Sequence, residues 1–179
     1  VRDICNKKNI ILIFDECTTG FRQTFGGIHK HYGVNPDMAI FGKALGNGYA
    51  INAIIGKEKI MRNAEKTFIS STFWTERTGY VAALKTLEEM EKIKSWKLIT
   101  AKGYQIRKKW ARLANKYNLK IDFMGIPSIS SFNIRSKNFV KYKTLITQEL
   151  LKDSILASNV VYFCTKHNQA MIDKYMFSL

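Results

Sequence analysis

Two charged residues, Asp15 and Lys43, stand at positions where the sequence can do chemistry. Each follows a short apolar run directly, residues 9–14 (NIILIF) for Asp15 and, one glycine later, residues 38–41 (MAIF) for Lys43. Such runs are typical of strands that are buried on both faces of a parallel sheet. Ligands of open α/β sheets bind beyond the carboxyl ends of the strands. The sequence therefore predicts that a carboxylate and an amine face one crevice.

This pair of groups is the one that pyridoxal phosphate (PLP) chemistry requires. A lysine amine forms a Schiff base with the aldehyde of the cofactor, and a carboxylate keeps the pyridine nitrogen protonated so that the ring accepts electrons. The alternative is a structural salt bridge, or two unrelated surface charges. Position at the strand ends does not by itself decide between these hypotheses.

The elements that must hold the pair follow an α/β pattern. A third apolar run occupies residues 51–55, and polar, Gly-rich stretches at residues 18–27 and 42–48 separate the three runs. Two amphipathic helices are predicted next, the first from Thr78 and the second ending near Asn118. Their apolar faces are Tyr80, Leu84, Leu87 and Met90 in the first helix, and Ile99, Ile106, Trp110, Leu113 and Tyr117 in the second. We expect these faces in the core rather than at a cofactor.

The rest of the chain predicts a small α+β unit. Its strands are expected at residues 120–124, 128–134 and 160–163, and its helices at residues 143–154 and 169–177. Because no Pro-rich linker occurs, the domain boundary is expected within a helix. We assign residues 1–95 to a large domain, and residues 96–179 to a connecting helix and a small domain.

Composition limits the classes of function. Hydrophobic residues make up 46% of the chain, which is enough for a core, and no apolar run is long enough to span a bilayer. The three cysteines, Cys5, Cys17 and Cys164, lack metal-ligand spacing, so we expect free thiols, no metal and a cytoplasmic location. The net charge of +15 is scattered. We interpret it as a solvated surface and expect no nucleic acid or membrane partner, with nucleic-acid binding as the minority alternative.

Three motifs resemble class III PLP-dependent aminotransferases. Residues 12–22 (LIFDECTTGFR) resemble the family signature of a hydrophobic strand followed by DE, and residues 41–48 (FGKALGNG) resemble its lysine loop. Residues 26–37 resemble the stretch between these motifs in the glutamate-1-semialdehyde 2,1-aminomutase-like branch. The resemblance covers the C-terminal part of the family only. It implies an aspartate-aminotransferase-type α/β fold (PLP fold type I), with a partial large domain and a small C-terminal α+β domain.

The resemblance also implies roles for four residues. Asp15 would pair with the pyridinium nitrogen, and Lys43 would hold PLP and carry the proton between the substrate carbon and the cofactor C4′ carbon. Cys17 replaces a valine that packs on the cofactor ring. Thr72 matches the threonine that binds the cofactor phosphate of the neighbouring subunit, although an ordinary loop threonine is a serious alternative.

The sequence departs from the aminomutase pattern after Thr72, where it has Trp74-Thr75-Glu76-Arg77. Trp74 and Arg77 would then shape a different substrate pocket. Arg22 and Arg135 are candidates to bind a substrate carboxylate, with surface salt bridges as the favoured alternative.

The function that the resemblance implies is amino-group transfer between an amine donor and a carbonyl acceptor by a homodimer. Two alternatives stay open: the intramolecular aminomutase reaction, and an inactive fragment or basic binding protein that kept the fold. Family members have roughly twice this length, and their N-terminal half holds the phosphate loop and the residue that stacks on the ring. We therefore expect the 179-residue chain alone not to be a competent catalyst.

Overall fold

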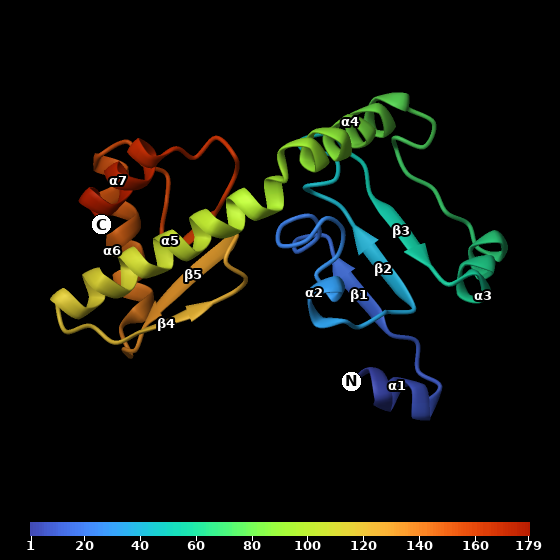
Figure 1. The fold of residues 1–179 in the computed structure, drawn as a ribbon, viewed down its shortest axis with the longest axis horizontal. Coiled ribbons are helices and arrows are strands. Elements are labelled where there is room, and N and C mark those ends of the chain that lie inside the picture. The colour runs from blue at the N-terminus through green and yellow to red at the C-terminus, as the bar shows by residue number, and fades with distance from the viewer. The chain divides into compact units, whose positions relative to one another are not determined.

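Two separate three-stranded sheets organise the chain (Figure 1). The computed structural model describes residues 1–179 and divides into two compact units, unit 1 at Val1–Trp96 and unit 2 at Lys97–Leu179. The helix α5 (Ser95–Lys116) contains the boundary between them. Each unit has its own buried apolar cluster.

The sheet of unit 1 has the order β1 (Ile13–Glu16), β2 (Met38–Phe41) and β3 (Ala53–Gly56). β1 and β2 pair in parallel as predicted, whereas β3 is antiparallel to β2. The connection over residues 42–52 is shorter than the dozen or more residues that a parallel crossover needs. The helices of this unit are α1 (Arg2–Lys8), α2 (His29–Tyr32), α3 (Glu58–Met61), the 3₁₀ helix η1 (Arg62–Lys66) and α4 (Arg77–Ile93).

The start of β1 was predicted wrongly, at residue 9 instead of Ile13. α1, which the sequence analysis did not predict, ends at Asn9 in the left-handed conformation (φ 52°). The backbone N–H of Leu12 then donates to the Asp37 carboxylate (2.8 Å), and its carbonyl accepts from the N–H groups of Asp37 and Met38. Strand pairing therefore begins later and includes Asp15, which lies within β1 rather than after it.

Asp37 joins three parts of unit 1. Its nearly buried carboxylate accepts hydrogen bonds from the Leu12 N–H, from Arg2 on α1 (2.9 Å) and from Lys57, the residue after β3 (2.6 Å). These three donors, the Leu12 N–H foremost, hold the pKa of Asp37 well below its usual range. The carboxylate therefore stays ionised and ties the beginning of β1 to the beginning of β2.

Only one face of the unit 1 sheet is covered. Phe14 and Ala39 point to the side that contacts α4, where Ala39, Phe41, Leu45 and Ala83 are buried. The opposite face carries Ile13, Asp15, Ile40 and Ile54, and Ile13 and Ile54 are 50% and 53% exposed. The prediction that these strands are buried on both faces is wrong for this chain.

The predicted core face of α4 is also partly wrong. Tyr80 and Leu84 are exposed, whereas Gly79 and Ala83 are buried. A Cβ on Gly79 would lie 2.9 Å from the carbonyl oxygen of Ala50. The helix thus approaches the backbone that follows the lysine loop through its small residues, which hydrophobic periodicity does not reveal.

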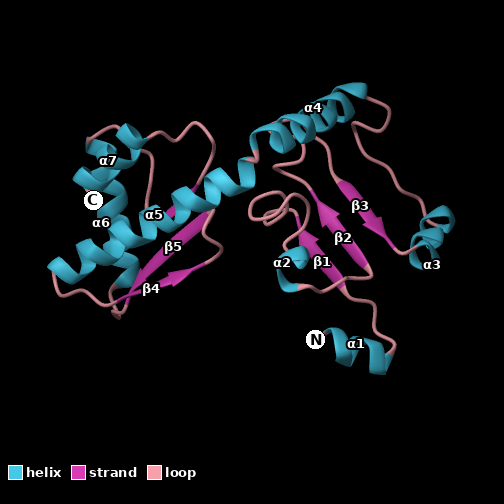
Figure 2. Cartoon of the chain, in the orientation of Figure 1, coloured by secondary structure: helices cyan, strands magenta, loops and turns pink.

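Unit 2 agrees closely with the predicted elements. Its antiparallel sheet has the order β4 (Ile121–Met124), β5 (Ile129–Ile134) and β6 (Val160–Tyr162), drawn as magenta strands in Figure 2. α6 (Phe139–Lys152) begins earlier than predicted, and α7 (Gln169–Ser178) closes the chain. Trp110 is buried as predicted, but Tyr117 is exposed. Neither unit contains a helix with the length and apolarity that crossing a membrane requires.

Candidate cofactor site

The parallel register of β1 and β2 brings the predicted site residues to one edge of the sheet. Glu16 pairs with Phe41 at the ends of the two strands. Two more steps in the same register place Cys17 beside Gly42 and Thr18 beside Lys43. The contacts agree, because Cys17 Sγ lies 3.4 Å from the position of a Cβ on Gly42, and Lys43 Nζ donates to Thr18 Oγ1 at 2.5 Å.

Lys43 lies in a tight turn. Its backbone is in the left-handed region (φ 45°), and the turn is closed by hydrogen bonds from Leu45 N to Gly42 O (3.0 Å) and from Asn47 N to Lys43 O (2.9 Å). The side chain is exposed and forms no ion pair. The structural salt bridge between Lys43 and Asp15, an alternative from the sequence, is therefore not formed.

Asp15 lies on the uncovered face of the sheet. Its Oδ1 accepts a hydrogen bond from the backbone N–H of Cys17 (3.0 Å). The hydrogen bonds from Cys17, and more weakly the positive charge of Lys43, lower the pKa of Asp15. At neutral pH the group is a carboxylate, the form that holds a proton on a ring nitrogen.

Cys17 lies between the two charged residues in the sequence and is half-buried. Burial raises the pKa of the thiol, and Asp15 adds to this through a hydrogen bond and its negative charge. The thiol is therefore neutral at physiological pH. A neutral thiol presents a small, apolar surface of the kind that packs against a flat ring.

A buried carboxylate, Glu16, fixes the loop that leaves β1. The residue is 1% exposed. It accepts hydrogen bonds from Thr19 Oγ1 (2.6 Å), from the His29 backbone N–H (3.2 Å) and from His29 Nδ1 (3.1 Å). Burial alone would raise the pKa of Glu16, but these hydrogen bonds and one from the Ile28 backbone outweigh it, so the pKa is lowered. Glu16 was not among the residues predicted from the sequence, although strand alternation from Asp15 directs its side chain to the covered face.

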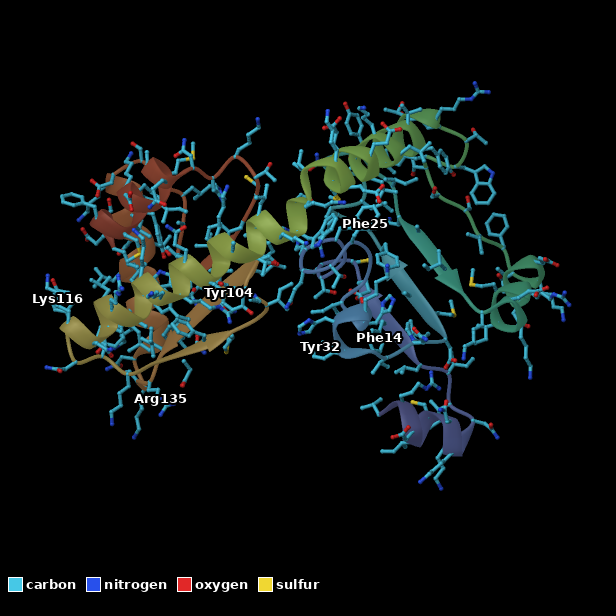
Figure 3. All side chains as sticks on the ribbon, in the orientation of Figure 1. Phe14, Phe25, Tyr32, Tyr104, Lys116 and Arg135 are labelled. Atoms are coloured by element: carbon cyan, nitrogen blue, oxygen red, sulfur yellow. The ribbon has the colours of Figure 1, made fainter.

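Thr72 forms no hydrogen bond with the other predicted site residues. It is exposed in the turn before α4. Arg135, labelled in Figure 3, forms a two-point ion pair with Asp122 (2.7 and 2.5 Å), which is the salt bridge that the sequence analysis favoured.

Of the predicted site residues, Asp15, Lys43 and Thr72 are exposed and Cys17 is half-buried. Two cavities, of about 350 and 670 Å³, are lined by residues of unit 2 alone. Neither is lined by Asp15, Cys17, Lys43 or Thr72.

Comparison with known proteins decides the family. The sequence model described as "Aminotransferase class-III" matches residues 1–165. This chain belongs to the class III aminotransferase family. The sequence-based assignment is thus confirmed.

Two curated relatives illustrate the range of the family. A 3-aminobutyryl-CoA aminotransferase of Cloacimonas acidaminovorans is 35% identical, over 93% of this chain and 42% of its own length. A glutamate-1-semialdehyde 2,1-aminomutase of Methanococcus maripaludis is 29% identical, over 98% of this chain and 45% of its own length. The chain thus spans less than half the length of these relatives. We use "family-length protein" for residues 1–179 together with the remaining length that such relatives have.

Solved structures establish the fold. The FumI protein of Sphingopyxis sp. MTA144, in a PLP form, superposes with a TM-score of 0.90 over 99% of this chain and 43% of its own, at 20% identity. A lysine aminotransferase of M. tuberculosis superposes with a TM-score of 0.80. The chain therefore has part of the PLP type I fold, as predicted.

Replacing Glu16 with Gln is expected to destabilise the family-length protein by about 1–3 kcal/mol at neutral pH, since a buried charged acceptor becomes an amide that also brings unpaired donors. The folded-state pKa of Glu16 lies below its ordinary value of 4.5, so the contribution is complete above that value and declines as the pH falls through the folded pKa. Urea unfolding at several pH values measures this. Glu58→Gln, an exposed pair with Arg62, is the control, and an equal loss in both variants would contradict the account.

Proposed function

We propose that the family-length protein is a PLP-dependent aminotransferase that moves an amino group from an amine donor to a carbonyl acceptor, with Lys43 as the lysine that binds the cofactor. The observation that supports this most is the β1–β2 register. This register places the ionised carboxylate of Asp15, the neutral thiol of Cys17 and the exposed amine of Lys43 at the same edge of the sheet. PLP chemistry uses such a carboxylate and such an amine.

The residues at this edge fit the cofactor. PLP, when bound, supplies an aldehyde that links to amines and a ring that withdraws electrons. The Asp15 carboxylate would accept a hydrogen bond from the ring nitrogen and keep its proton there. Cys17 would pack beside the ring. Lys43 Nζ would bind the cofactor, and once released would take a proton from the substrate carbon that bears the amino group.

Trp74 and Arg77 support a substrate pocket unlike that of the aminomutases. Both are exposed, at and just before the start of α4, so they are free to contact a bound substrate. The relative named as an aminotransferase is also more similar to this chain than the one named as an aminomutase. We therefore favour transfer between two molecules.

The intramolecular aminomutase reaction is the second candidate. Relatives with that name match up to 98% of this chain, and the reaction would use the same Asp15 and Lys43. Glutamate-1-semialdehyde as sole substrate separates the two. Conversion without any added carbonyl acceptor would favour the aminomutase.

We also propose that the family-length protein is a homodimer. Thr72 is exposed, as suits a threonine that acts on the cofactor of a neighbouring subunit. Sedimentation equilibrium is expected to give twice the mass of one chain. A fully active monomer would contradict this proposal.

Borohydride reduction of the PLP-loaded, family-length protein is expected to place the pyridoxyl label on Lys43, because this amine is exposed beside Asp15 and Cys17. Peptide mapping identifies the labelled lysine. Lys57, whose amine is paired with Asp37, serves as an internal control and should stay unlabelled. Label on any other lysine would contradict the assignment, and absence of PLP absorbance would favour a binding protein or an inactive fragment.

Asp15→Asn is expected to keep part of the bound PLP and to lose most amino transfer, by about 100-fold or more, since a neutral amide does not hold the ring nitrogen protonated. Half-transamination with an amino donor, followed by absorbance, measures the loss. Asp122→Asn, in a surface ion pair of unit 2, is the matched control. Turnover like that of the wild type in Asp15→Asn would show that this carboxylate is structural.

A further inference from the structure

The side chain of Thr18 is hydrogen-bonded to Lys43. Its Oγ1 accepts a hydrogen bond from Lys43 Nζ at 2.5 Å, and this is the one hydrogen bond formed by the amine. On the basis of the function proposed above, we propose that Thr18 is a positioning residue, whose hydroxyl holds the Lys43 amine at the strand-end edge for capture of the cofactor. No role was predicted for Thr18 from the sequence.

The position of Thr18 is fixed by the loop around it. Its carbonyl accepts a hydrogen bond from Arg22 Nε (2.9 Å). The next residue, Thr19, donates its hydroxyl to the buried Glu16, and Gly20 N donates to the Glu16 carbonyl (2.8 Å). Hydrogen bonds therefore hold the backbone that carries the Thr18 hydroxyl in one conformation.

A fixed hydrogen-bond acceptor restricts the conformations of the Lys43 side chain. A lysine has four rotatable side-chain bonds, and its exposed amine samples many positions unless something holds it. The tight turn fixes the backbone of Lys43, so one hydrogen bond to a braced acceptor is enough to select few rotamers. The amine then lies in a defined place before the cofactor arrives.

A hydroxyl suits this task better than a carboxylate. A carboxylate at position 18 would favour the charged ammonium, which cannot attack an aldehyde, whereas a hydroxyl holds the amine without fixing its charge. In the capture step Lys43 Nζ forms a C=N bond to the aldehyde carbon. The aldehyde oxygen leaves as water and carries away the two hydrogens of the neutral amine. Orientation of the attacking nitrogen directly affects the rate of this step.

The test uses the cofactor-free, family-length protein and three variants. Thr18→Val keeps the shape and removes the hydroxyl, and Thr18→Ser keeps the hydroxyl. Thr144→Val is the matched control, since the Thr144 hydroxyl donates to the Val140 carbonyl on exposed α6. Stopped-flow absorbance after addition of PLP gives the rate of covalent capture. Equilibrium binding of 4′-deoxypyridoxine phosphate, which lacks the aldehyde, reports whether the cofactor pocket is intact.

We expect Thr18→Val to capture PLP about five- to tenfold more slowly than the wild type, because a change of this size corresponds to the loss of one hydrogen bond. Thr18→Ser and Thr144→Val should match the wild type within about twofold, and binding of the aldehyde-free analogue should be unchanged. Capture by Thr18→Val at the wild-type rate, an equal loss in Thr18→Ser, or parallel loss of analogue binding would each overturn the positioning role. A wild-type protein that binds the analogue but never captures PLP would instead overturn the proposed function, and this inference with it.

Discussion

The parallel pairing of β1 with β2 is the constraint on which the site depends. Ile13 opposite Met38 sets the register, and every site residue at this edge follows from it. A slip of one residue would turn Asp15 to the covered face and separate Thr18 from Lys43. Asp37 secures the pairing at the beginning of the two strands, through the Leu12 N–H and two cations. At the other end, buried Glu16 secures the loop that carries Thr18.

Sequence alone was sufficient for the parts that periodicity controls. The run before Lys43 coincides with β2, and the strands of unit 2 agree with the predicted ones within a residue at each end. Position in the sequence singled out Asp15 and Lys43 as candidates, and the resemblance to class III aminotransferases implied the chemistry that they would do. Their roles at a bound cofactor stay predictions.

What the sequence did not reveal depends on contacts between distant residues. β1 starts late because Leu12 pairs with the side chain of Asp37, and β3 is antiparallel because its connection to β2 is short. Gly79 lets α4 approach the backbone at Ala50, and a hydrophobic pattern does not predict this contact. Thr18 was not predicted as a site residue because it is far from Lys43 in the sequence and comes next to it only when β1 and β2 pair.

The candidate site residues of this chain lie on an open part of its surface. Asp15 lies on an apolar sheet face with Ile13 and Ile54 half-exposed, and the two unit 2 cavities described above are lined by other residues. The phosphate of PLP needs several N–H donors, as at a helix N-terminus, and the resemblance places the loop that supplies them in the N-terminal half of family members. The most direct measurement is PLP titration of residues 1–179 alone beside the family-length protein, by absorbance and borohydride labelling of Lys43. We predict full labelling of the family-length protein, and little labelling with aggregation of the shorter chain. A soluble, monodisperse chain of 179 residues that binds PLP tightly and transaminates would contradict the account.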